Sequence, residues 1–428
     1  MNKTATGISP SKAILLCINS IIGAGLFINP SSLAKIAGPY GFLGYVLGAL
    51  LILPIILCIA ELAKLHPVAG GLYIYSKTYI GRWAGFLSAW AYFVGKTVSA
   101  ALLMHKFVQF FQARAYFLQD TPVLLIDIAM ILFFMLLNIG GVSIGGNITY
   151  FFSALKAAPV LATFAIGFFL FDTKNFQEVV SLQEVCSSLP IAVFALLGFE
   201  VICAIGNQIH DAKKNIKRVI LTSFFIVAAI NTLFQTIIFG VIGYDLIDAQ
   251  EPILVLGMKT FATNPFIGSL LNGLVFASIV GGFFSLLTSN CWNLHTIAHN
   301  NHLPGKAFLT KVNHHNVPWI SLLIESGIAV FILSITTNQI PLQNMSVLAQ
   351  IASFSIAVVA AFFAVSSKAT EGLPRWTPLL ALLSCCFLFG IAGYKVATSG
   401  VSVPFIVLFL TGCIAAIAQQ YITGVKRG

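Results

Sequence analysis

The chain has 428 residues, of which 58% are hydrophobic and only 8% are charged. A soluble domain carries about 25% charged residues, so this composition excludes an ordinary soluble protein and predicts a polytopic, all-α membrane protein. The formal net charge of +10 does not indicate nucleic-acid binding, because the basic residues are scattered among loops between apolar segments. The eight cysteines show no metal-ligand spacing, so we expect no metal, cofactor or redox centre.

Twelve apolar segments are candidates to cross a bilayer, which takes about 20 residues of helix. They are residues 12–36, 41–63, 84–111, 122–140, 148–171, 187–207, 219–243, 267–297, 318–335, 347–366, 376–396 and 401–422. If successive loops are assigned alternately to the two sides of the membrane, most lysines and arginines fall on the same side as the N-terminus. The cytoplasmic loops of membrane proteins are rich in these residues. We therefore expect both termini in the cytoplasm and one transmembrane domain over residues 1–428.

The first apolar segment is interrupted by two glycines, Gly23 and Gly25, on either side of Ala24. Each glycine weakens a helix by about 1 kcal/mol. Non-helical backbone at membrane depth is tolerated only where protein or a water-filled cavity satisfies its polar groups. The break therefore favours a half-helix end that binds a solute, as in transporters. The alternative is close packing between membrane helices through small residues.

A second break falls in the sixth segment, where Gly198 and Glu200 lie near the middle of the span. The two interrupted segments are five apart, and because five is odd, two five-helix units would insert with opposite topology. Paired interruptions of this kind indicate an inverted-repeat transporter with a site near the membrane midplane. The predicted repeats cover residues 12–171 and 187–366, and two further helices cover 376–422.

Four segments of the chain carry motifs of one known family. Residues 22–27, followed by Pro30, resemble its first-helix motif, and residues 67–75 resemble its P-x-A-G-G-x-Y-x-Y loop. Residues 302–319 resemble its G-x-L-P-x-x-F…T-P loop, and residues 211–218 resemble its N-P-x-R-x-I-P-R-A segment without the two prolines. On these motifs the chain resembles the amino acid–polyamine–organocation (APC) superfamily of amino acid permeases and antiporters.

The resemblance implies a leucine-transporter-like fold of twelve helices, with helices 1 and 6 broken, that carries amino acids or related amines by alternating access. It implies that amides at the first break receive the substrate carboxylate and that carbonyls at both breaks accept from its α-ammonium group. Phe194 stands where related antiporters place an aromatic ring over the substrate, although such a ring is also an ordinary core residue. The substrate-binding residues expected on this basis are Ile21, Gly23, Ala24, Gly25, Phe194, Leu197, Gly198 and Lys96.

Lys156 lies inside the fifth apolar segment, and an ionisable residue within a span is a functional hypothesis by default. Many sodium-independent members of the family carry a lysine at the matching position. The resemblance implies that its ammonium group replaces a bound sodium ion, with Ser285 or Ser289 of the eighth segment as its partner. The lysine is then either a fixed cation or a proton carrier.

Among the other charged residues within the predicted spans, Glu200 and Lys96 carry functional hypotheses. Glu200 stands where related antiporters carry an acidic residue near the inner gate, so it either takes up a proton or forms a permanent ion pair. Lys96 departs from the family pattern, because cationic-substrate antiporters have a small polar residue there. It either pairs with Glu200 or recognises an acidic substrate, and it argues against a purely cationic one. Glu61 is expected to cap a helix or pair locally.

We therefore expect a sodium-independent secondary transporter of amino acids, working by proton-coupled symport or by exchange, in a bacterial inner membrane. Its expected partners are an amino acid, protons and lipid, with no nucleic acid, and its expected state is a monomer or homodimer. The sequence has neither a Walker-type loop nor a catalytic constellation within the spans, so ATP coupling and an enzyme are disfavoured. The alternatives are a non-transporting sensor of the same fold, suggested by the missing prolines, and an exchanger of polyamines or organic amines.

Overall fold

The structure is a computed structural model that describes residues 8–68, 70–141, 146–260, 265–370 and 372–425. Both chain ends and Ala69, part of the P-x-A-G-G motif, lie outside these residues. Within the described ranges the regular structure is helical, and the recorded extended pairing is one isolated parallel bridge between Ile8 and Ile209. The expected all-α fold class is therefore confirmed.

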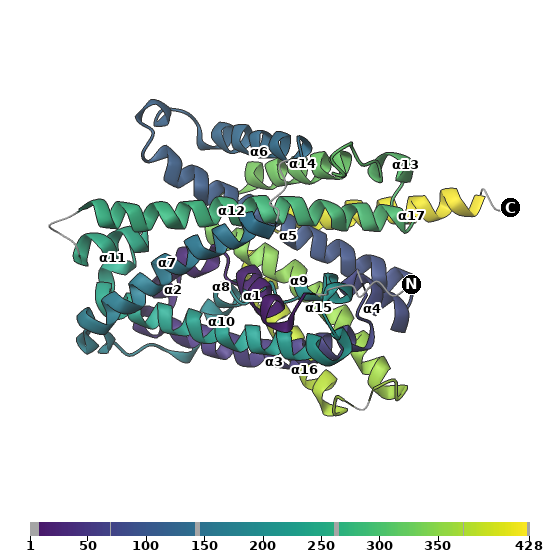
Figure 1. The fold of residues 1–428 in the computed structure, drawn as a ribbon, viewed down its shortest axis with the longest axis horizontal. Helices are drawn as coiled ribbons and strands as arrows, with labels where there is room; N and C mark the ends of the chain where they lie inside the picture. Colours follow the sequence, from purple (N-terminus) through teal and green to yellow (C-terminus); the bar gives the residue numbers. More distant parts are fainter. Residues whose placement is uncertain (1–7, 69, 142–145, 261–264, 371, 426–428) are drawn as a thin grey trace. The chain divides into compact units, whose positions relative to one another are not determined.

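Figure 1 shows the helices in chain order, joined in places by short 3₁₀ turns. The helices are α1 (Pro10–Ile21), α2 (Gly25–Ala37), α3 (Gly41–Leu65), α4 (Gly71–Tyr79), α5 (Arg82–Gln112), α6 (Val123–Ile139), α7 (Gly146–Leu170), α8 (Leu182–Phe194), α9 (Val201–Ala204), α10 (Ala212–Ile242), α11 (Pro252–Thr260), α12 (Pro265–His299), α13 (Lys306–Leu309), α14 (Trp319–Ile335), α15 (Gln339–Ser366), α16 (Trp376–Thr398) and α17 (Ser402–Val425).

Ten of the twelve predicted apolar segments are occupied by a helix, and the first and sixth consist of helices separated by a break. Among the described residues, 7 helical stretches are long and apolar enough to cross a membrane, and the first of them, Gly25–Leu65, joins α2 to α3. Shorter apolar helices account for the remaining segments: Pro10–Ile21, Val123–Ile139, Leu155–Leu170, Leu182–Phe194 and Trp319–Ile335. The chain is thus built as a multi-pass integral membrane protein, while the number of crossings stays a prediction.

The chain divides into two compact units, each drawn from several parts of the sequence. The first unit comprises Met1–Ser88, Pro159–Asn272 and Ile351–Ile391. The second comprises Ala89–Ala158, Gly273–Gln350 and Ala392–Gly428. The predicted repeats at 12–171 and 187–366 follow a different division of the chain and stay a prediction.

The core of the first unit is formed by α3 and α10, which lie side by side, with α1 and α2 packed against them (Figure 1). Buried polar side chains add hydrogen bonds to this helix packing. Asn29 of α2 is fully buried and donates to the carbonyl of Ile191 in α8 at 2.8 Å. Gln235 of α10 donates to the carbonyl of Pro30 at 3.2 Å. These bonds hold α2, the second half of the first broken helix, against α8 and α10.

In the second unit, α14 packs against α6, and aromatic and polar contacts join α12 to both α5 and α6. Asn138 of α6 donates to the hydroxyl of Thr288 in α12 at 2.6 Å. Trp90 of α5 donates through its indole nitrogen to the carbonyl of Phe409 in α17 at 3.0 Å. Because these are polar bonds between apolar helices, they fix which helix faces meet.

Candidate functional site

The first broken helix is interrupted where the two glycines predict it. α1 ends at Ile21, and the chain turns back so that the amide of Gly23 donates to the carbonyl of Ile21 at 2.7 Å. α2 then begins at Gly25, with Ala24 at its N-cap and no side chain capping it. The amides of a helix's first turn have no partners within the helix, so this N-terminus presents uncapped donors.

The second broken helix is interrupted between α8, which ends at Phe194, and α9, which begins at Val201. Gly198 lies between them with φ of +126°, a region that side-chain-bearing residues rarely adopt. Its amide donates to a carboxylate oxygen of Glu200 at 3.0 Å. Glu200 is 3% exposed, and its hydrogen bond to Gly198 holds the irregular backbone of this break in place.

The two breaks lie directly against one another within the first unit. A Cβ atom added to Gly198 would lie 2.5 Å from the carbonyl oxygen of Ser20 and 3.0 Å from the Cα of Ile21. A Cβ atom added to Gly25 would lie 2.9 Å from the Cβ of Ala195. A Cβ at Gly23 would meet only the carbonyl oxygen of Ile21, at 3.9 Å. Gly25 and Gly198 are therefore the glycines that let the two breaks approach, and Gly23 is not.

This arrangement brings the N-terminus of α2 and the C-terminus of α1 to the same place, beside the second break. A helix N-terminus carries a partial positive charge and a C-terminus a partial negative charge. The pair therefore offers donors for an anionic group and acceptors for a cationic one, as the carboxylate and ammonium of an amino acid require. Ile21, Ala24 and Leu197 are buried at this place, whereas Phe194 and Gly23 are partly exposed.

The other predicted site residues lie in the second unit. Lys156 of α7 is 8% exposed and Lys96 of α5 is 7% exposed, with the Lys96 ammonium 5.3 Å from the centre of the Tyr92 ring. Ser285 and Ser289 of α12 are both exposed, and Ser289 donates to the carbonyl of Leu286 in its own helix. The pairing of Lys156 with these serines stays a prediction, as does that of Lys96 with Glu200.

The loop that carries the P-x-A-G-G motif packs beside the second break. A Cβ added to Gly71 would lie 3.5 Å from the Cβ of Cys203 in α9. His66 and Tyr79 flank the motif, and the Nε2 atom of His66 lies 3.0 Å from the hydroxyl of Tyr79. Burial lowers the pKa of His66 below its usual value. The motif thus packs against α9 within the first unit.

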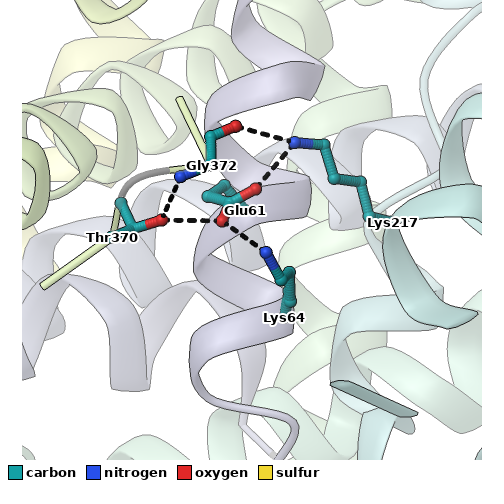
Figure 2. Close-up of polar contacts among 5 residues, drawn as sticks. All are labelled: Glu61, Lys64, Lys217, Thr370 and Gly372. Atoms are coloured by element: carbon teal, nitrogen blue, oxygen red, sulfur yellow. Dashed lines mark hydrogen bonds and ion pairs between the residues drawn. The ribbon is translucent and has the colours of Figure 1, made fainter. Parts of the chain in front are cut away.

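A carboxylate at the end of α3 collects several donors, as Figure 2 shows. Glu61 accepts from the ammonium of Lys64 at 3.0 Å, which confirms the expected local pairing. It also accepts from Lys217 of α10 at 2.7 Å and from the hydroxyl of Thr370 at 2.7 Å. A Cβ on Gly372 would clash with this carboxylate, so the segment after α15 passes directly over it. The cluster ties α3, α10 and that segment together.

A buried glutamate that was not among the predicted site residues lies in α14, in the second unit. Glu325 is fully buried, and one carboxylate oxygen accepts from the amide of Asn290 in α12 at 3.0 Å. The same amide lies 3.2 Å from the carbonyl of Phe93 and 3.1 Å from the hydroxyl of Thr97, both in α5. The signal was visible, because an acidic residue within an apolar helix is a functional hypothesis by default.

A second buried pair joins α5 to α6 in the same unit. The Nδ1 atom of His105 lies 2.8 Å from a carboxylate oxygen of Asp127, and both side chains are buried. The aspartate was visible in the sequence as a charge within an apolar segment. Its partner was not, because His105 and Asp127 belong to different helices and no spacing rule connects them.

Comparison with known proteins gives a consistent result. The family model described as "Amino acid permease" matches residues 8–417. The serine/threonine exchanger SteT of Bacillus subtilis is 26% identical over 408 residues, covering 88% of this chain and 89% of the relative. The amino-acid permease RocC and the gamma-aminobutyric acid permease of the same organism are 24% and 21% identical, each covering 74% of this chain and 70% and 71% of the relative.

Because the match covers nearly the whole chain, the protein belongs to the amino acid permease family of the APC superfamily. Its apolar helices indicate an integral, multi-pass membrane protein. Its family and its relatives are transporters of amino acids, so the chain is a transporter and not an enzyme. The expected family is thereby confirmed.

Proposed function

We propose that this protein is a sodium-independent secondary transporter that carries amino acids by alternating access, through proton-coupled symport or exchange. The observation that carries the proposal is the contact between the two helix breaks, in which Gly25 lies against Ala195 and Gly198 lies against Ser20. The amides of Ala24 and Gly25 receive the substrate carboxylate, and carbonyls near Ile21 and Phe194 receive its ammonium group.

The finer architecture is part of the same proposal. The chain would cross the membrane twelve times in a leucine-transporter-like 5+5 inverted repeat, followed by two further helices, with both termini in the cytoplasm. Lys156 would take the place of a bound sodium ion, and Glu200 would couple the second break to proton uptake. Burial of both side chains supports these roles, since an ionisable group within a span is costly unless it serves a function.

For the substrate, we favour a small neutral amino acid, because the serine/threonine exchanger covers most of this chain. Lys96 motivates a second candidate, an acidic amino acid. Its ammonium is buried over the Tyr92 ring and would attract a substrate carboxylate if the two face the same site.

Uptake into proteoliposomes tests this function. A panel of labelled amino acids is offered with and without an inward proton gradient, and with and without unlabelled substrate inside. Uptake driven by the gradient identifies symport, and uptake that requires internal substrate identifies exchange. Binding of amino acids without flux under any condition would overturn the transporter and favour the sensor.

A further inference from the structure

Glu325 has one recorded hydrogen-bond partner among the described residues, and that partner is a neutral amide. The side chain is fully buried in α14, and its Oε2 atom has no hydrogen-bond partner among the described residues. Its Oε1 atom accepts from Asn290, the one donor recorded for it in the described part of the chain. No cation is paired with Glu325 within the described ranges. An unpaired charge in such a place is costly, because burial removes hydration and nothing replaces it.

The cluster around Glu325 offers the carboxyl group a single donor. The Asn290 amide has two N–H groups but lies within hydrogen-bond distance of three acceptors, on Phe93, Thr97 and Glu325. The Thr97 hydroxyl donates to the same Phe93 carbonyl at 2.9 Å. Because Thr97 donates to Phe93, the two Asn290 N–H groups are left for Thr97 and Glu325, so the carboxyl group has one N–H donor. A buried carboxylate needs a further donor or a cation, whereas a protonated carboxyl group carries no charge to compensate.

Other titratable groups on the packed elements do not supply that donor. On α12, the thiol of Cys291 donates to the carbonyl of Thr288 at 3.1 Å. On α6, Asp127 is already paired with His105 of α5. The short helix α13, next to α14, carries Lys306, and no ion pair between Lys306 and Glu325 is recorded among the described residues. On α5, the ammonium group of Lys96 lies over the Tyr92 ring. Asn290 is thus the recorded hydrogen-bond donor to Glu325 within the described ranges.

We propose that Glu325 is a proton-binding site that takes up and releases a proton during transport, with Asn290 as the residue that positions its carboxyl group. The statement that this proton is coupled to transport rests on the proposed function above. The site is formed within the second unit, by α5, α12 and α14, and it shares no residue with the helix breaks of the first unit.

The first test measures the response of uptake to a proton gradient in proteoliposomes. For the wild type, we expect uptake to rise with an inward gradient. For Glu325→Gln, we expect the ratio of uptake with and without the gradient to fall to unity, while exchange against internal substrate at equal pH continues. Glu61→Gln is the matched control, because it makes the same change at a buried glutamate and should keep the gradient response. A Glu325→Gln protein that responds as the wild type does overturns the coupling role.

The second test observes the proton directly and needs no transport. The infrared carbonyl band of a protonated carboxylic acid is followed in the purified protein as the pH is raised. We expect the wild-type spectrum to contain a component that disappears with rising pH, that is kept in Glu61→Gln, that is lost in the difference between wild type and Glu325→Gln, and that shifts in Asn290→Ala. A Glu325→Gln spectrum that matches the wild type at every pH, or a Glu325 component that no pH removes, overturns the proposal. If the wild type transports no amino acid, the proposed function fails while this band still tests the proton site.

Discussion

Glu61 and Glu325 are both glutamates buried within apolar helices, and their surroundings differ sharply. Glu61 is 1% exposed and accepts hydrogen bonds from two lysines and a threonine. Glu325 is 0% exposed, accepts from one asparagine and keeps an oxygen without a partner among the described residues. Burial alone therefore does not define a role. The donors around a carboxylate decide whether it is a fixed charge that joins helices or a group ready to take a proton.

Removing the satisfied carboxylate should have the largest effect on stability. We expect Glu61→Ala to lower the free energy of unfolding by about 3 kcal/mol, at the low end for a broken buried pair, because Lys64 and Lys217 can turn toward solvent. Thermal unfolding of the purified protein measures this loss. Unchanged stability would mean that the cluster in Figure 2 does not hold the first unit together.

Removing one donor from the same cluster should cost less. Lys217→Met deletes the bond to Glu61 at 2.7 Å and the bond to the Gly372 carbonyl at 3.2 Å, but Lys64 and Thr370 remain. We expect a loss of about 2 kcal/mol, since a hydrogen bond to a charged group contributes roughly 1.5–3 kcal/mol. The same unfolding measurement applies, and a loss as large as that of Glu61→Ala would show that Lys217 is the essential partner.

On the Glu325 side, a change to the neutral part of the cluster should cost about one hydrogen bond. Thr97→Val keeps the shape of the side chain and removes the hydroxyl that lies 3.1 Å from the Asn290 amide. We expect a loss of about 1 kcal/mol in unfolding free energy. The gradient response should persist, because Glu325 keeps Asn290. Loss of that response in a folded Thr97→Val protein would give Thr97 a part in proton binding.

The smallest effect on stability is expected at Glu325 itself. Under acidic conditions, where the carboxyl group is protonated, Glu325→Gln should change the free energy of unfolding by less than about 0.5 kcal/mol, because one neutral group replaces another. Unfolding of wild type and variant at matched acidic pH measures this difference. A large loss would mean that the wild type needs the charge, which contradicts the contrast with Glu61.

Much of the first unit's site could be predicted from the sequence, because glycines within an apolar segment indicate either a break in the helix or close packing between helices. Gly23, Gly25 and Gly198 predict the two interruptions at the residues where α1 and α8 end. The sequence cannot distinguish Gly23 from Gly25, since both stand beside Ala24. Only the tertiary contact does so, because a Cβ at Gly25 meets Ala195 of the other break, whereas a Cβ at Gly23 meets the carbonyl oxygen of Ile21 in its own break.

Long-range partners are what the sequence could not supply. The local pair between Glu61 and Lys64 follows from their spacing of three residues on a helix. Lys217 and Thr370 come from distant parts of the chain, and no spacing rule joins them to Glu61. For the same reason, the isolation of Glu325 was invisible, since it depends on which side chains of α5 and α12 reach it.

The central claim is that the contact between the two helix breaks binds the amino acid, and equilibrium binding to purified variants tests it most directly. Labelled serine, threonine and glutamate are offered to the wild type, Gly198→Ala and Gly390→Ala. A Cβ at Gly390 meets nothing within 4 Å, so this variant controls for the substitution itself. We predict that Gly390→Ala binds as the wild type does and that Gly198→Ala loses binding. A folded Gly198→Ala protein that binds as tightly as the wild type would contradict the account.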